Sequence, residues 1–269
     1  MRIAIACSSD DPASSNMADH IVREYDLDSV SPGLFVYGKH EIVLQRIDKP
    51  LWSYEHADSL NVDMIIFLSQ HQSTAGIPAL TVHSMGNWGI ENTYGGEPHA
   101  LSAAAPAPML SALRLLNSIE SSVGKTYEAT HHGPCLKTPA FFMEMGGNRS
   151  TIENKDLAAL VGSRAFETAL EILDGKAEYE KTAIGIGGGH YPSKFSALAV
   201  GREYAFSYIM PKYAIRRKDG NTDLGMLKKA IEMTKDLDIA VIEWKSLDSA
   251  TKKEVLSMLD GQGIESEKV

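Results

Sequence analysis

The chain has 269 residues, a formal net charge of −9, 43% hydrophobic and 23% charged residues, and two cysteines, Cys7 and Cys135. Two cysteines are fewer than a secreted disulfide scaffold of this size would carry, and they lack the Cys-x-x-Cys spacing of a thiolate zinc site. The negative charge argues against general nucleic-acid binding, and no apolar run is long enough to span a membrane. We therefore expect a cytoplasmic monomer with no membrane or DNA partner.

Apolar runs that suit strands alternate along the chain with segments of helical periodicity. The predicted strands are 1–9, 34–38, 41–47, 63–69, 78–84, 127–132, 140–147, 181–189, 204–211 and 239–245. The predicted helices are 13–25, 109–123, 154–175, 223–237 and 249–261. Alternation of this kind indicates a three-layer α/β sandwich with a mostly parallel sheet. Strands that follow one another without a helix, in 34–46 and 126–145, make part of the sheet antiparallel, so we expect a mixed sheet in a single domain, 1–269.

The segment 84–108, SMGNWGIENTYGGEPHALSAAAPAP, is rich in glycine and proline and has no sustained periodicity. Long irregular loops in compact domains are usually functional or disordered. Trp88, Tyr94 and His99 argue against disorder, because aromatic residues are scarce in disordered segments. We expect an ordered loop inserted over a site, with Trp88 or Tyr94 lining it.

Six of the nine histidines lie at predicted strand ends or in glycine-rich loops: His71, His83, His99, His131, His132 and His190. A single histidine at a strand end is usually a hydrogen-bonded packing residue, but the recurrence favours a common site. The carboxyl ends of parallel strands meet in a crevice where ligands bind, and imidazole suits zinc. We predict a Zn²⁺ site built from a subset of His83, His99, His132, His190 and Glu144.

The pair His131-His132 carries a geometric limit, because neighbouring residues on a strand face opposite ways. His132 is nearer the turn at Gly133-Pro134 and is our choice for the ligand. We expect His131 to lie behind the ligands, as a supporting residue and a candidate catalytic group. Glu144 ends an apolar strand, where an unpaired charge is costly. It is either a metal ligand or general base, or an inter-strand structural carboxylate.

The glycine run before His190 and one basic run each allow two interpretations. Three glycines after a strand let backbone N–H groups approach an anion, or simply allow close packing. The sequence lacks the nucleotide-binding GxGxxG context and a P-loop. The basic run comprises Lys212, Arg216, Arg217 and Lys218, followed by Lys228 and Lys229. It is a solvated surface or a local patch for an anionic partner. Cys135 is similarly either a core residue or a reactive or ligating thiol.

Four segments, SQHQSTAGIPALTVHSMGNWG, THHGP, FMEMGG and GIGGGHYPSKFS, resemble the archaeal- and plant-type D-aminoacyl-tRNA deacylase family, in the same order. The resemblance runs from the N-terminus to at least the GGGHY segment. It implies a fold similar to the phosphorylase/peptidyl-tRNA hydrolase group and a zinc-dependent hydrolase. Such an enzyme cleaves the ester between a D-amino acid and the 3′-terminal ribose of tRNA.

With that activity, bound zinc would activate water and polarise the ester carbonyl. Backbone N–H groups of Gly187, Gly188 and Gly189 would stabilise the oxyanion, and Glu144 or a free histidine would accept the proton. Arg216, Arg217 and Lys218 would contact the tRNA. The alternatives are a zinc amidohydrolase or exopeptidase acting on small molecules, a metal-free nucleoside phosphorylase-like enzyme, and a non-catalytic metal- or RNA-binding module.

Overall fold

The structure is a computed structural model that describes residues 1–39, 41–72, 76–202, 204–215 and 222–269. Its strands are β1 (Ile3–Ser8), β2 (Asp28–Ser31), β3 (Leu34–Tyr37), β4 (Ile42–Ile47), β5 (Met64–Gln72), β6 (Ala79–His83), β7 (Gly86–Asn87), β8 (Ala100–Leu101), β9 (Gly124–Tyr127), β10 (Ala140–Gly147), β11 (Lys181–Ile186), β12 (Tyr204–Met210), β13 (Ile239–Ile242) and β14 (Glu265–Lys268). Its helices are α1 (Pro12–Glu24), α2 (Pro106–Asn117), α3 (Arg149–Ile152), α4 (Lys155–Leu173), α5 (Ser193–Arg202), α6 (Lys212–Ile215), α7 (Gly225–Met233) and α8 (Ser249–Gly261), with short 3₁₀ helices η1 (Leu51–Ser53), η2 (Glu55–Leu60) and η3 (Trp244–Ser246).

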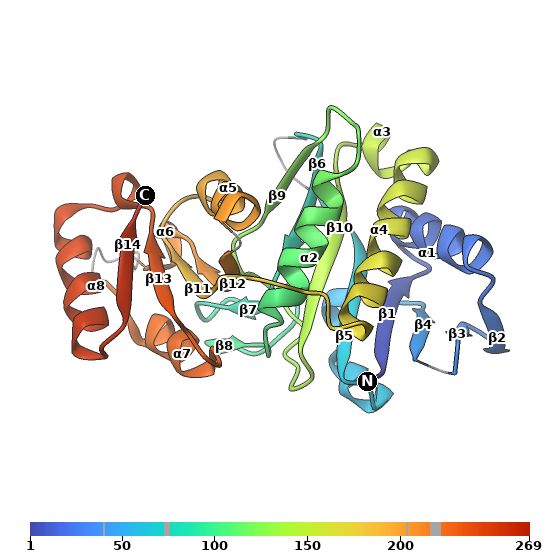
Figure 1. The fold of residues 1–269 in the computed structure, drawn as a ribbon, viewed down its shortest axis with the longest axis horizontal. Helices are drawn as coiled ribbons and strands as arrows, with labels where there is room; N and C mark the ends of the chain where they lie inside the picture. Colours follow the sequence, from blue (N-terminus) through green and yellow to red (C-terminus); the bar gives the residue numbers. More distant parts are fainter. Residues whose placement is uncertain (40, 73–75, 203, 216–221) are drawn as a thin grey trace.

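Eight strands form the larger sheet, in the order β2-β3-β4-β1-β5-β10-β6-β9. The central strands β4, β1, β5 and β10 are parallel, whereas β6 runs antiparallel to β10 and β3 runs antiparallel to β4. The α/β fold with a mixed, largely parallel sheet is therefore confirmed (Figure 1). The four described strands β12-β11-β13-β14 form a second, wholly parallel sheet, which the sequence did not predict as separate.

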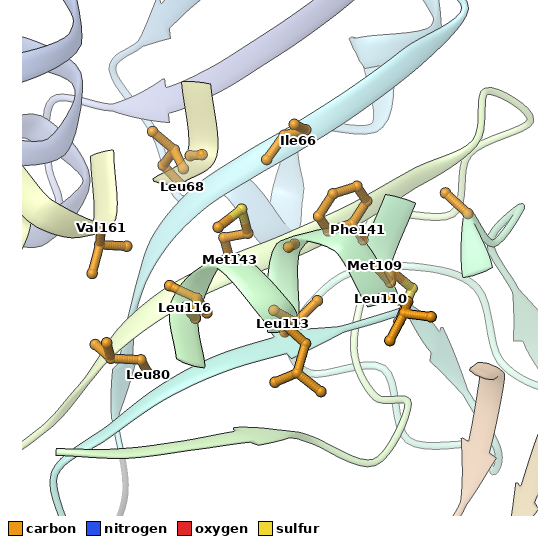
Figure 2. Packing of buried hydrophobic residues seen from close by; sticks show 14 of the residues in the cluster. Ile66, Leu68, Leu80, Met109, Leu110, Leu113, Leu116, Phe141, Met143 and Val161 are labelled. Carbon is orange, nitrogen blue, oxygen red and sulfur yellow. The ribbon is translucent and has the colours of Figure 1, made fainter. Parts of the chain in front are cut away.

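Helices α1, α2 and α4 cover one face of the larger sheet. The helical spacing of their apolar residues places those residues along one side of each helix, which packs on the sheet. Leu110, Leu113 and Leu116 of α2 are completely buried and pack with Phe141 and Met143 of β10 (Figure 2). The alternating residues of β10 point to the opposite face, where Ala140 and Phe142 pack beside the 3₁₀ helices η1 and η2. That second face carries the candidate site.

The helix ends follow ordinary capping chemistry. The side chain of Asn154 accepts a hydrogen bond from the Leu157 N–H at the start of α4, and that of Asp248 accepts from the Thr251 N–H at the start of α8. Gly175, the predicted stop, follows α4 with a φ of 67°, a left-handed conformation that glycine adopts readily. Helix α5, which directly follows the GGGHYP segment, was not predicted.

The predicted strand 127–132 is wrong beyond its first residue, because β9 ends at Tyr127. The Glu128 N–H still donates to Val82 O of β6 at 3.0 Å, but the next residues bond elsewhere: Ala129 N–H donates to His190 O at 2.8 Å and Thr130 N–H to Ile209 O at 3.0 Å. These bonds tie the end of the larger sheet to the second sheet. Among the described residues no helix has the length and apolarity needed to cross a membrane.

Candidate functional site

Three adjacent strands place polar side chains on the face of the larger sheet that packs beside η1 and η2. Glu144 of β10 pairs in register with Ser69 of β5 and with Thr81 of β6. Since side chains on one face recur every second residue, His71 and His83 lie on the same face as Glu144. His83 pairs with Phe142 near the start of β10, whereas His71 pairs with Gly146 near its end. The histidines therefore meet on a sheet face and not, as predicted, beyond a common carboxyl edge.

The segment after β9 brings Glu128, His131 and His132 over this face. His132 has a φ of 42°, so the chain turns at this residue and does not continue as a strand. The turn places both neighbouring imidazoles near His83. The centroid of the His83 ring lies 4.2 Å from that of His131 and 5.0 Å from that of His132. A Cβ on Gly133 would lie 2.1 Å from the N atom of Gly96, so glycine is required where the 84–108 segment packs on the turn.

His190 reaches the same place from the second sheet, on the glycine loop that follows β11. Its Nε2 lies 2.7 Å from Oε2 of Glu128. The next residue, Tyr191, places its hydroxyl 2.5 Å from Nε2 of His71. His71 presents its other nitrogen, Nδ1, to Glu128 at 3.2 Å and to Glu144 at 3.4 Å.

The side chains form two groups with metal-ligand spacing, one of His83, His131 and His132 and one of His71, Glu128 and His190. In each group the ligand atoms lie within 4.8 Å of one another. Both oxygens of Glu128 are buried and accept no aligned hydrogen bond from the described residues, although an imidazole nitrogen lies only 2.7 Å away. A buried carboxylate without aligned donors is costly unless a cation satisfies it. These residues therefore fit a metal ion that prefers nitrogen and oxygen ligands.

Electrostatics keep part of the histidine cluster neutral. Burial, together with the positive charge of His83, holds the pKa of His131 well below its usual value and lowers the pKa of His132 to about 4. Burial also lowers the pKa of His71 and His83, but the adjacent Glu144 carboxylate outweighs it and raises both. Neutral imidazole is the form that binds a metal.

Two carboxyl groups beside the cluster have pKa values shifted in opposite directions. Burial raises the pKa of Glu144, but His71 and His83 outweigh burial, and the pKa is held well below its usual value. Asp11, at the N-cap of α1, has its pKa raised to about 6 by burial, although hydrogen bonds from the Ser14 and Gln70 N–H groups lower it.

A cleft of about 400 Å³ opens over these groups. His71, His131, His132, His190 and Glu144 line its interior, together with Asp11 and Phe142. Trp52 and Tyr94 also line it, and their rings meet edge to face with centroids 5.9 Å apart. Tyr94 is 62% exposed, so the cleft has an accessible aromatic wall beside its polar interior.

Unlike Tyr94, the other predicted site residues of the 84–108 segment lie away from the cleft. Trp88 is buried, donates from Nε1 to Thr130 O at 2.7 Å and packs with Leu101, so it does not line the cleft. His99 lies outside both histidine groups, with Nδ1 at 3.2 Å from Trp88 O. The segment is ordered, as expected, and short strands β7 and β8 pair within it. Cys135 likewise stays outside the two groups, with Sγ 3.9 Å from Leu101 O.

The glycine loop and the basic run are only partly available for their predicted roles. The N–H of Gly187 donates to Met210 O and that of Gly188 to the Ser246 hydroxyl, both at 2.8 Å, whereas Gly189 is exposed. Arg216, Arg217 and Lys218 lie outside the described residues. Beside them in sequence, Lys212 and Lys228 are exposed, and Lys229 donates to His99 O at 2.9 Å.

Sequence reasoning missed Glu128 and Asp11 and did not select His71 as a ligand. Glu128 was hidden because 127–132 looked like a strand, but a carboxylate at the end of an apolar strand is the same signal that singled out Glu144, and Glu128 lies three residues before the histidine pair. Asp11 caps the start of α1, an ordinary structural role for aspartate that by itself points to no site. Its contact with the cleft depends on the packing of α1 against β5, which no local pattern encodes.

Known proteins resemble this chain over nearly its whole length. A model of the D-aminoacyl-tRNA deacylase family matches residues 58–267. Proteins named D-aminoacyl-tRNA deacylase from Methanocaldococcus jannaschii, 30% identical over 100% of both chains, and from Thermococcus onnurineus, 34% identical over 95% of both, are similar to the chain. A crystal structure of a conserved protein of unknown function, AF0625, has a TM-score of 0.86 and 26% identity, covering 99% of this chain and 95% of that one.

The fold and cleft define an α/β protein with a histidine- and carboxylate-lined site that can hold metal. The matches over nearly the whole chain specify the family further. The chain belongs to the D-aminoacyl-tRNA deacylase family.

Proposed function

We propose that the chain hydrolyses the ester between a D-amino acid and the 3′-terminal ribose of tRNA, releasing free D-amino acid and tRNA in the cytoplasm. Family membership over residues 58–267 supports the reaction, and the cleft supplies groups suited to ester hydrolysis. The observation that carries the proposal is the buried Glu128 carboxylate, which accepts no aligned hydrogen bond from the part of the chain that the structure describes and faces His71 and His190.

The cofactor that we propose is Zn²⁺, which neutral imidazole and carboxylate ligands suit. His71, Glu128 and His190 would hold one ion, and His83, His131 and His132 a second. Bound zinc supplies Lewis acidity toward a carbonyl and lowers the pKa of water toward neutrality. Backbone carbonyls fix the rings of the second group, since Nδ1 of His131 lies 2.9 Å from Ala129 O and Nδ1 of His132 lies 2.7 Å from Gly133 O. This leaves the Nε2 atoms of both rings for the ion.

Glu144 and Asp11 divide the carboxylate roles in the cleft. Glu144 is ionised at neutral pH and lies 3.4 Å from His71 and 3.7 Å from His83, so it orients both rings. A general base works best when its pKa is near the working pH. Burial raises the pKa of Asp11 to about 6, so Asp11 is a better candidate to accept a proton from water than Glu144, which the sequence suggested beside a free histidine. Opposite shifts in two neighbouring carboxyl groups are the usual sign of such a division.

We assign the groups that contact the rest of the substrate from their accessibility in the cleft and the glycine loop. The N–H of Gly189, in the exposed part of the glycine loop, is our candidate donor to the developing oxyanion. Tyr94 and Trp52 form the wall on which the terminal adenine stacks, because exposed aromatic rings in a cleft give a base-stacking surface.

The experiment is release of D-amino acid from D-aminoacyl-tRNA by protein purified without chelator, with zinc measured on the same sample. Glu128→Gln should lose both zinc and activity, whereas Glu120→Gln, at an exposed position, should keep both. Zinc retention in Glu128→Gln would show that Glu128 is not a ligand. Hydrolysis of small amides, with tRNA esters left intact, would favour an amidohydrolase.

A further inference from the structure

In the second sheet, the carboxyl ends of four parallel strands lie on the same side and form one edge of the sheet. Strands β11, β12, β13 and β14 are all parallel, so their carboxyl ends meet on the same side of the sheet. The glycine loop that carries His190 follows β11, α6 follows β12, η3 follows β13, and the end of β14 lies beside them (Figure 1). One edge therefore holds both a residue of the cleft and three further surface segments.

Hydrogen bonds join these segments to the glycine loop. The Lys212 N–H donates to Gly188 O at 3.0 Å, and the Gly188 N–H donates to the Ser246 hydroxyl at 2.8 Å. The Trp244 N–H donates to Val269 O at 3.0 Å, which fixes η3 against the end of β14. Only a few residues of backbone separate this edge from His190.

Lysines gather at this edge. Lys212, Lys245 and Lys268 come from the ends of three of the strands, and all three are exposed. The ammonium groups of Lys268 and Lys252 lie 4.4 Å and 4.8 Å from the centroid of a Trp244 ring. Cation–π contacts of this kind hold flexible lysines in place without neutralising them, so their charge is available to an anion.

The sequence has a matching charge asymmetry. Residues 181–269 contain 14 lysines and arginines against 12 aspartates and glutamates, whereas residues 1–180 contain 12 against 23. The net charges are therefore +2 and −11, within the total of −9. The charge balance therefore favours the second part of the chain over the first as the place where an anionic partner lies.

We propose that the carboxyl edge of the second sheet, centred on Trp244, Lys252 and Lys268, is the surface on which phosphates of the tRNA acceptor end lie. The inference rests on the proposed function, because the partner is the tRNA of that reaction. The edge directs the 3′ end along the glycine loop to the cleft. Binding here is electrostatic and independent of base sequence, because lysines contact phosphates as point charges.

The test compares the double variant Lys252→Glu/Lys268→Glu with the wild-type protein on two substrates, D-aminoacyl-tRNA and D-aminoacyl-adenosine. The matched control is Lys39→Glu/Lys155→Glu, which makes the same charge change at exposed positions in the acidic part of the chain. Binding of uncharged tRNA is measured from 50 to 200 mM salt, a range in which phosphate contacts respond strongly. Circular dichroism melting shows that each variant is folded.

We expect the Lys252/Lys268 variant to lose about tenfold or more in kcat/KM on the tRNA ester, through KM, and to flatten the salt dependence of tRNA binding by about two units of slope. Its rate on the adenosine ester should match that of the wild-type protein. Equal losses on both substrates, an unchanged salt slope, or an equal loss in the control would overturn the proposal.

The tRNA-binding measurement separates this proposal from the proposed function. If the wild-type protein hydrolysed neither ester, the deacylase function would fail. A variant with weakened tRNA binding and a flattened salt slope would then still support the surface, and a variant with unchanged binding would refute it.

Discussion

Nε2 of His190 lies 2.7 Å from Oε2 of Glu128, although His190 follows a strand of the second sheet and Glu128 follows a strand of the larger one. The contact is close, yet neither Glu128 oxygen accepts an aligned hydrogen bond from the described residues. The site is therefore completed only when the two sheets are packed together, and Glu128 is the residue at which both contribute.

Removing the charge of Glu128 tests its place in the site. We expect Glu128→Gln to weaken zinc affinity at least about tenfold, because a neutral amide is a poor ligand beside two imidazoles. Competition with a chromophoric chelator measures this affinity without any assay of activity. An affinity equal to that of Glu120→Gln, an exposed control, would contradict the assignment.

The two aromatic residues of the 84–108 segment should behave differently. Tyr94→Ala should raise KM about tenfold with no change in melting temperature, because it removes an exposed stacking surface. Trp88→Ala should instead lower the free energy of unfolding by about 3–5 kcal/mol, because it empties a buried site and removes the hydrogen bond to Thr130. Denaturant titration and steady-state kinetics of both variants check the contrast, which an unchanged KM in Tyr94→Ala would refute.

Asp11 should give the chain a pH-dependent cost of folding. Its pKa is raised from 3.8 to about 6, so the folded state favours the protonated form, and stability falls as pH rises from about 4 to 6. Asn at this position does not titrate. Between pH 4 and 7 the free energy of unfolding of Asp11→Asn should therefore rise relative to the wild-type protein, by about 3 kcal/mol.

Chelator-treated protein is used for that comparison, with unfolding by urea at each pH. Asp10→Asn, one residue earlier and exposed, serves as the control and should follow the wild-type curve. Parallel curves for Asp11→Asn and the wild-type protein would show that the Asp11 carboxyl does not bind a proton more tightly in the folded state.

The basic run beyond Lys212 gives another prediction. We expect Arg216→Glu/Arg217→Glu to impair cleavage of D-aminoacyl-tRNA much more than cleavage of a short D-aminoacyl-adenosine ester. Each phosphate that the variant no longer binds should reduce the salt slope by about one unit. Equal effects on the long and short substrates, or none on either, would make this run a solvated surface.

Local patterns predicted much of the fold, because buried strands and amphipathic helices such as 249–261 have periodicities that a single segment reveals. They also singled out Glu144, His83, His132 and His190, all of which the structure brings to one cleft or its edge. They could not show that the strands form two sheets, since pairing partners far apart in sequence leave no local trace. Glu128 and Trp88 illustrate the same limit. The turn after β9 places Glu128 beside His71 and His190, and Thr130 in that turn accepts the hydrogen bond from the buried Trp88.

The central claim is that metal-dependent hydrolysis of D-aminoacyl-tRNA occurs in this cleft. The most direct measurement is the rate of D-tyrosine release from D-tyrosyl-tRNA, beside L-tyrosine release from L-tyrosyl-tRNA, before chelation, after it and after zinc is restored. We expect hydrolysis of the D-ester alone, loss of activity on chelation and recovery with zinc. Equal hydrolysis of both esters, or full activity in protein shown to be free of metal, would contradict this claim.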